Sequence, residues 1–165
     1  MDFSSRIAQL IHEDHKETIT LIELLEGMVA KARRKIPDVS DPQVRTTLQK
    51  AAAMIAHETR GHFDFEETML FPILEEAGDV AIGAHLREEH ANILPLGEQV
   101  ATLASAALTD GFTDASWADF RNLTGEMTER MLAHIQKEEM ALLPLLEDLL
   151  DPETDMELSQ AFASA

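Results

Sequence analysis

Residues 62–72 read His-Phe-Asp-Phe-Glu-Glu-Thr-Met-Leu-Phe-Pro, and residues 134–144 read His-Ile-Gln-Lys-Glu-Glu-Met-Ala-Leu-Leu-Pro. Both segments follow one pattern, H-x-x-x-E-E-x-x-x-x-P. On an α-helix, residues four apart in sequence lie about 40° apart around the axis and one turn apart along it. His62 and Glu66 can therefore reach one site together, and so can His134 and Glu138. Two such helices facing each other would supply two histidines and two carboxylates to a shared core.

Apolar residues recur at helical spacing in four long stretches around this repeat. Asp41 resembles an N-cap with Pro42 at the first helical position, and Gly78 and Gly111 mark later breaks. The expected helices cover residues 4–35, 42–77, 79–108 and, from 114 or 116, up to 150. Short connections imply antiparallel neighbours, so the sequence predicts an all-α, antiparallel, up-down-up-down four-helix bundle over residues 1–152. We expect residues 153–165 to form a polar, frayed C-terminal tail.

The first and third expected helices each carry one histidine that is level with the repeat. His15 and His62 lie about equally far from the middle of the first connection, and so do His90 and His134 around the third. In antiparallel helical hairpins, residues equally distant from the turn lie at the same height. Across the second connection, Glu66 and His90 also lie at nearly equal distances from the turn. All four helices therefore place a ligand-type side chain in one layer of the bundle.

This layer favours a metal centre over a structural role for the histidines. An imidazole offers one nitrogen to a metal, and a carboxylate four residues away can bridge that metal to a second one. A single H-x-x-x-E pair is often only a hydrogen-bonded pair on a helix surface. Two matched copies, level with a histidine on each remaining helix, are harder to explain in that way, because polar groups on apolar faces are costly to bury without partners.

Composition narrows the classes of function. The 165 residues carry 31 acidic and 13 basic side chains, for a net charge of −18. This charge disfavours binding to nucleic acid or to anionic membranes. The absence of cysteine excludes disulfides, iron–sulfur ligation and a thiol nucleophile, and the absence of tyrosine excludes a tyrosyl radical on this chain. With no secretion signal or membrane-spanning run, we expect a cytoplasmic protein.

At these residues the sequence resembles the hemerythrin-like, or HHE cation-binding, family. The resemblance extends from His12 to Pro144. It implies a hemerythrin-like four-helix bundle that holds two iron ions with an oxo or hydroxo bridge, with manganese or zinc as less favoured metals. Carried over residue by residue, it implies terminal histidine ligands and bridging glutamates at the following positions: His15, His62, His90 and His134, with Glu66 and Glu138.

The sequence departs from the oxygen-carrying hemerythrins on two helices. Those proteins have H-x-x-x-H on the third helix, whereas Leu86 and Leu94 flank His90 here. They have H-x-x-x-x-D on the fourth helix, whereas Glu138 lies four residues after His134 and Glu139 five. Glu138 matches the spacing of the second helix and is the preferred bridge, with Glu139 as the alternative. Fewer histidines leave more open metal positions, which suits sensing, peroxide or nitric oxide chemistry, or labile iron.

Several neighbouring residues have open roles. His12, one turn before His15, is either a ligand or a support for one, whereas His57 and His85 point about 140° away from the expected ligands. Three acidic residues either orient the ligating imidazoles or are simply solvated. These are Glu58, Glu67 and Glu89.

Three kinds of function are compatible with this pattern. The first is a di-iron protein that binds or senses dioxygen, nitric oxide, peroxide or iron itself. The second is a di-iron enzyme acting on peroxide or nitric oxide, or an iron donor in iron–sulfur repair. The third is a structural or interaction bundle that binds zinc or manganese. The expected partner is a small diatomic ligand or peroxide, and the sequence leaves the oligomeric state open.

Overall fold

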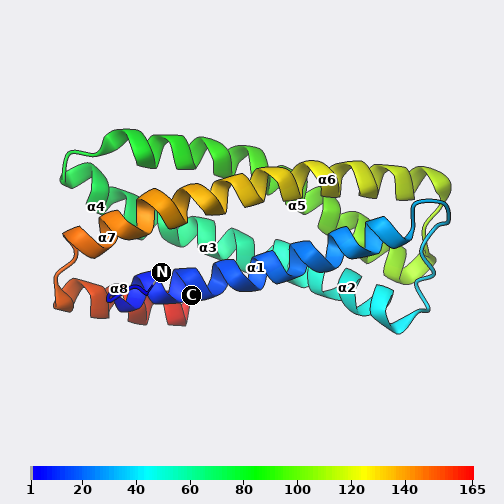
Figure 1. Cartoon of the computed structure of the whole chain (residues 1–165), viewed down its shortest axis with the longest axis horizontal. Helices are drawn as coiled ribbons and strands as arrows, with labels where there is room; N and C mark the ends of the chain where they lie inside the picture. The colour runs from blue at the N-terminus through cyan, green and yellow to red at the C-terminus, as the bar shows by residue number, and fades with distance from the viewer. Residues whose placement is uncertain (1) are drawn as a thin grey trace.

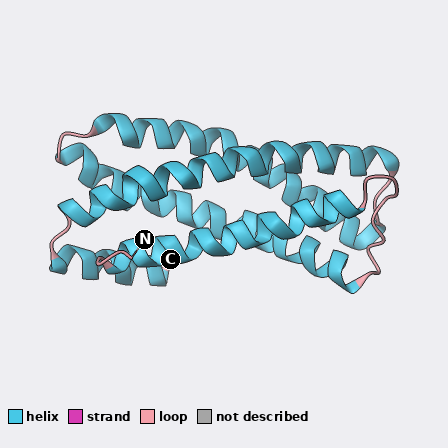
Figure 2. Cartoon of the chain, in the orientation of Figure 1, coloured by secondary structure: helices cyan, strands magenta, loops and turns pink. Residues whose placement is uncertain are grey.

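The chain folds into a bundle of helices. The computed structural model describes residues 2–165, apart from the side chains of His57 and Glu58. Four long helical rods lie side by side, and a shorter helix lies beside the first rod, close to both chain termini (Figure 1). Residues 2–165 contain no strand, and short loops join successive rods (Figure 2). The prediction of an all-α helical bundle is confirmed.

Two rods are continuous helices and two contain π-helical turns, labelled η. The first and third rods are α1 (Arg6–Lys31) and α5 (Val80–Asp110). The second rod consists of α2 (Pro42–Ala53), η1 (Met54–Thr59), α3 (Arg60–Phe65), η2 (Glu66–Leu70) and α4 (Phe71–Glu76). The fourth consists of α6 (Asp114–Lys137), η3 (Glu138–Leu142) and α7 (Leu143–Leu149), and α8 (Pro152–Ser164) follows it. Both α1 and α5 contact α2 and α6, so the rods form a closed ring in chain order.

Local capping explains where the rods begin and end. The Asp41 side chain accepts hydrogen bonds from the backbone of Gln43 and Val44, with Pro42 in the first turn, as the sequence predicts. Gly78 and Gly111 adopt φ angles of 97° and 74°, which favour glycine, at the ends of the second and third rods. None of the helices in residues 2–165 is long and apolar enough to cross a membrane.

The π-helical turns η2 and η3 follow from the prolines that close the two repeats. A proline has no N–H for the carbonyl four residues earlier, and its ring clashes with that carbonyl. The helix widens by one residue before each proline, so that the N–H of Phe71 donates to the Glu66 carbonyl and that of Leu143 to the Glu138 carbonyl. Each widened turn therefore begins at the first glutamate of its repeat.

A layer of buried charged and imidazole side chains interrupts a mostly apolar core. This polar layer consists of His15, Glu66, His90, His134 and Glu138, with His62 beside them. The buried polar side chains of this layer lie between apolar clusters on either side of it along the bundle. Toward the chain termini, each rod contributes at least one fully buried aliphatic residue within two helical turns of the layer. These residues are Ile11, Leu70, Leu86, Leu142 and Leu143.

The prediction of a frayed C-terminal tail is wrong. Residues 152–164 form α8, which packs against α1 with Leu158 buried in the core. The Asp151 side chain caps α8 by accepting from the backbone of Thr154, and Pro152 occupies the first turn. The Asp151-Pro152 pair that follows the fourth rod therefore starts α8.

Gly97 allows α5 to approach η1 closely, which gives a first prediction. A Cβ atom at Gly97 would lie 2.5 Å from Cγ2 of Ile55, a buried branched side chain with little room to move. We expect Gly97→Ala to lower the free energy of unfolding by about 1–2 kcal/mol, since overpacking outweighs the better helix propensity of alanine. Urea unfolding would measure this.

The matched control for this prediction is Gly27→Ala in α1. A Cβ atom at Gly27 would meet nothing within 4 Å. This change should raise the free energy of unfolding by about 0.5–1 kcal/mol, because alanine restricts the unfolded chain and favours the helix. A stabilising Gly97→Ala would show that the approach of η1 to α5 is looser than the structure has it.

Candidate metal centre

The six residues expected to bind metal lie together in the polar layer. They form two sets of four side chains, and within each set one donor atom from every side chain lies within 4.8 Å of the others. The first set is His15, His62, Glu66 and Glu138, and the second is Glu66, His90, His134 and Glu138. Both glutamates belong to both sets, so the arrangement has two histidines at each end and two carboxylates between them.

Each shared glutamate directs one oxygen to each set. In the first set, Oε2 of Glu138 lies 2.8 Å from Nε2 of His15, and Oε1 of Glu66 lies 2.9 Å from Nε2 of His62. In the second set, Oε1 of Glu138 lies 2.7 Å from Nε2 of His134, and Oε2 of Glu66 lies 3.2 Å from Nε2 of His90. This is the division of oxygens that a carboxylate needs to bridge two cations.

The donor atoms of the second set are not satisfied by hydrogen bonds among themselves. Oε2 of Glu66 and Oε1 of Glu138 are buried without a hydrogen bond from the described residues, although imidazole nitrogens lie near them. In addition, Nε2 of His90 lies only 3.1 Å from Nε2 of His134. Leaving buried carboxylate oxygens unpaired is costly. A cation between these oxygens and nitrogens would satisfy them, so the residues present fit a bound metal.

A closed ring of carboxylates fixes the orientation of all four imidazoles. In each histidine, Nδ1 lies within hydrogen-bond distance of a carboxylate on a neighbouring rod, and Nδ1 is the donor because an ionised carboxylate only accepts. The Nδ1–oxygen pairs are His62 with Asp14 (3.0 Å), His90 with Glu67 (2.8 Å), His134 with Glu89 (2.8 Å) and His15 with Glu139 (2.6 Å). Each rod thus supplies one carboxylate to the next rod, and every Nε2 points into the layer, as a ligating histidine requires.

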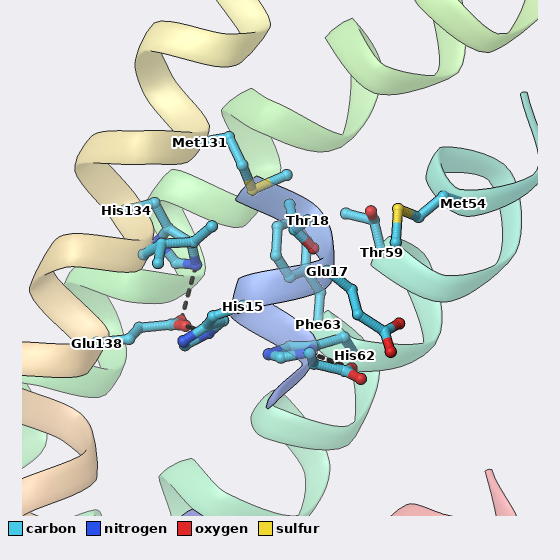
Figure 3. Close-up of a pocket in the computed structure, with 12 residues that line it drawn as sticks. His15, Glu17, Thr18, Met54, Thr59, His62, Phe63, Met131, His134 and Glu138 are labelled. Atoms are coloured by element: carbon cyan, nitrogen blue, oxygen red, sulfur yellow. Dashed lines mark hydrogen bonds and ion pairs between the residues drawn. The ribbon is translucent and has the colours of Figure 1, made fainter. Parts of the chain in front are cut away.

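A small cavity reaches the layer from the side of α1 and η1 (Figure 3). It offers about 20 Å³ of space to the centre of a water-sized sphere. Its walls include His15, His62 and the shared Glu138, together with His134 of the second set. The remaining wall is formed mainly by Thr18, Met54, Thr59, Phe63 and Met131. His90 lies away from the cavity, because the Phe63 ring stacks on it at a centroid distance of 3.8 Å.

The structure also places the neighbouring residues whose roles the sequence left open. Nδ1 of His12 lies 2.8 Å from Oε2 of Glu139, so Glu139 holds both His12 and His15 and lies outside the two sets. His85 is exposed and lies near Glu89 and Lys137. His57 and the carboxylate of Glu58 are outside the side chains that the structure describes.

The sequence did not predict every residue of the carboxylate ring. The sequence analysis assigns no role to Asp14, and it leaves Glu67 and Glu89 either orienting the imidazoles or solvated. Their signal is the acidic residue next to each expected ligand. Consecutive residues on a helix point about 100° apart, so when one of two neighbours faces the core, the other faces the adjacent rod.

Comparison with known proteins assigns the chain to a family. The model of the hemerythrin HHE cation-binding domain matches residues 6–155, which include every residue of the two sets. The chain belongs to the hemerythrin HHE cation-binding family. No curated protein matches it.

The charges of the metal-free HHE centre hold each other in place. Burial by itself would lower the pKa of His15 and His90, but their glutamate neighbours, Glu138 foremost, raise both pKa values to about 9. Burial would likewise raise the pKa of Glu138, but the adjacent His134, with His15 and His90, holds it well below its usual range. Protons on the imidazoles therefore balance the carboxylates in the absence of metal, and a metal must displace them.

This balance predicts a pH dependence for the metal-free HHE domain. A histidine whose pKa is raised in the folded state stabilises that state fully below the unfolded value of 6.5, and the stabilisation is lost as pH rises through the folded value. We therefore expect the free energy of unfolding of the chelated protein to fall between pH 6.5 and about 9, as His15 and His90 lose their protons. Urea unfolding at several pH values would measure this.

The metal-loaded protein serves as the comparison for this pH series. Its imidazole Nε2 atoms would bind metal and carry no proton, so its stability should not fall over the same pH range. Parallel pH profiles for the loaded and chelated forms would contradict the proposed role of these histidines.

Proposed function

We propose that this protein binds two iron ions in the polar layer and uses them to bind or sense a small molecule. The observation that carries the proposal is the pair of donor sets that share Glu66 and Glu138, with one oxygen of each glutamate directed to each set. His15 and His62 would hold one ion, and His90 and His134 the other. Membership of a cation-binding family agrees with this assignment.

The chemistry of the donors favours iron over other metals. Each set offers two imidazole nitrogens and two carboxylate oxygens, a mixed set that suits iron. A structural zinc site is usually closed by cysteine and histidine in a tetrahedron, whereas this chain has no cysteine. Bound iron would supply redox chemistry and open coordination positions. Zinc and manganese remain the alternatives that metal analysis would reveal.

The cavity limits the size of the molecule that can reach the centre. Its space of about 20 Å³ for the centre of a water-sized sphere is enough for one water, which needs about 10–15 Å³ on this measure. Dioxygen, nitric oxide and peroxide are of comparable width. The side chains of Met54, Phe63 and Met131 line the cavity and would exclude larger molecules. We therefore propose a diatomic ligand or peroxide as the partner.

Metal content and the visible spectrum test the proposal. The protein would be purified without added metal, reconstituted anaerobically with iron(II), and then exposed separately to dioxygen, peroxide and nitric oxide. We expect two irons per chain and a change in absorption with at least one of these molecules, without steady turnover. Sustained consumption of peroxide or nitric oxide would make the protein an enzyme. Failure to bind iron after reconstitution would overturn the di-iron proposal.

A further inference from the structure

Helix α8 is fixed against the start of α1 by specific contacts. After the fourth rod ends, the chain turns back and α8 lies beside α1 (Figure 1). The Asp155 carboxylate accepts hydrogen bonds from the backbone N–H groups of Arg6 and Ile7, both at 2.9 Å, and from the Ser5 hydroxyl at 3.0 Å. It thereby satisfies N–H groups that the first turn of a helix leaves unpaired. Together with the burial of Leu158, these bonds fix the position of α8.

The same face of α8 reaches the polar layer through Phe162. Asp155, Leu158 and Phe162 have the i, i+3, i+7 spacing of one helical face. The Phe162 ring meets the His62 ring edge-on, with a centroid distance of 5.9 Å and an interplanar angle of 85°. It also packs against Phe65 at 5.0 Å. Phe162 therefore covers an imidazole of the first donor set.

His62 has the most exposed imidazole of the four histidines in the two sets. Its side chain is 9% exposed, compared with 5%, 3% and 1% for the other three histidines of the two sets. The carboxylate that holds it, Asp14, is 39% exposed. The Phe63 ring stacks on the His90 ring and covers one of its faces. Phe162 does not line the cavity that reaches the centre, so it covers a part of the His62 ring outside that cavity.

We propose that α8 is a cover for the metal centre and that Phe162 is the positioning residue that closes it. By holding the His62 ring in place and excluding water, Phe162 slows exchange of the metal held by His15 and His62. Phe162 lies beyond residues 6–155, which the family model matches, so this cover is an addition to the matched domain. This inference rests on the proposed function, because it concerns one of the two metals.

The test is the release of iron(II) from the loaded, full-length protein to an excess of 2,2′-bipyridine under anaerobic conditions. Phe162→Ala should speed the release of one iron per chain about tenfold, the lower end of the effect of removing a group that supports a ligand. Release of the second iron should keep its wild-type rate. Phe162→Tyr retains the ring and should restore the slow release.

The matched control is Phe112→Ala, at the opposite end of the bundle. Phe112 is also half-buried and packs its ring against Trp117 and Phe120, at 5.1 and 5.3 Å. Phe112→Ala should lower the free energy of unfolding about as much as Phe162→Ala does, and it should leave both iron release rates unchanged. A second readout does not involve metal: nuclear Overhauser contacts between the Phe162 and His62 rings should appear in the chelated wild-type protein.

The outcomes separate this inference from the proposed function. Two bound irons with unchanged release in Phe162→Ala would overturn the cover and leave the di-iron centre standing. Equal acceleration of both irons, or the same acceleration in Phe112→Ala, would also overturn it, because it would reflect general loosening of the bundle. A wild-type protein that binds no iron would overturn both proposals.

Discussion

Glu138→Gln should weaken the binding of both metals, whereas His62→Ala should weaken the binding of one. Glu138 belongs to both donor sets and is almost completely buried. Glutamine keeps the size of the side chain but has no charge and only one oxygen, so it cannot direct one oxygen to each metal. We expect both affinities to fall by more than about 100-fold, the largest effect typical for a group that only supports a ligand. Iron(II) titration calorimetry would measure both affinities.

The His62→Ala and His134→Ala variants complete this comparison. Each removes a histidine that belongs to one set only, so each should retain about one iron per chain with the lower stability that accompanies lost metal. Glu129→Gln, an exposed glutamate on the same rod as Glu138, should change nothing. If Glu138→Gln bound two irons with wild-type affinity, Glu138 would not be the bridge, and Glu139 would become the candidate.

The bundle and the inward-facing side chains could be predicted from the sequence because both depend on helical periodicity. His62 with Glu66, and His134 with Glu138, share a helix face by spacing alone. Hairpin symmetry then brings His15 and His90 to the same layer, since short connections force neighbouring helices to be antiparallel. The structure places these six residues together.

Contacts between rods could not be predicted in the same way. Glu67 and Glu139 each follow an inward-facing glutamate, and the sequence leaves Glu67 as a support or a solvated residue and Glu139 as an alternative bridge. Whether such a residue meets water or an imidazole depends on the rotation of the adjacent rod, which periodicity within one helix does not determine. The same reasoning applies to α8, because the burial of Leu158 depends on a fold back onto α1 that the composition of the last residues does not reveal.

The π-helical turns could be predicted from the sequence only in part. The proline six residues after Glu66 is visible in the sequence, and a proline within a helix predicts a local disruption. The structure shows that the disruption is a widened turn starting at Glu66 and, in the second copy, at Glu138. The E-E-x-x-x-x-P part of the repeat thus shapes the helix at Glu66 and at Glu138.

Asp14→Ala and Glu67→Ala should each weaken the binding of one metal ion, and the affected ion should differ between the two variants. Asp14 holds His62 of the first set, and Glu67 holds His90 of the second. Without its carboxylate, an imidazole loses its fixed orientation and is a weaker base, which typically lowers metal affinity by about 10–100-fold. Stepwise iron(II) titration should therefore show one weakened and one unchanged binding step in each variant.

Combining the two substitutions distinguishes separate supports from a single cooperative ring. If each carboxylate acts only on its own histidine, the double variant should show both steps weakened, with free-energy changes that add within about 0.5 kcal/mol. Glu26→Ala, an exposed acidic residue on α1, controls for the loss of one negative charge. Weakening of both metals by Asp14→Ala alone would mean that the ring orients the four imidazoles as a unit, since each rod supplies the carboxylate that fixes the next.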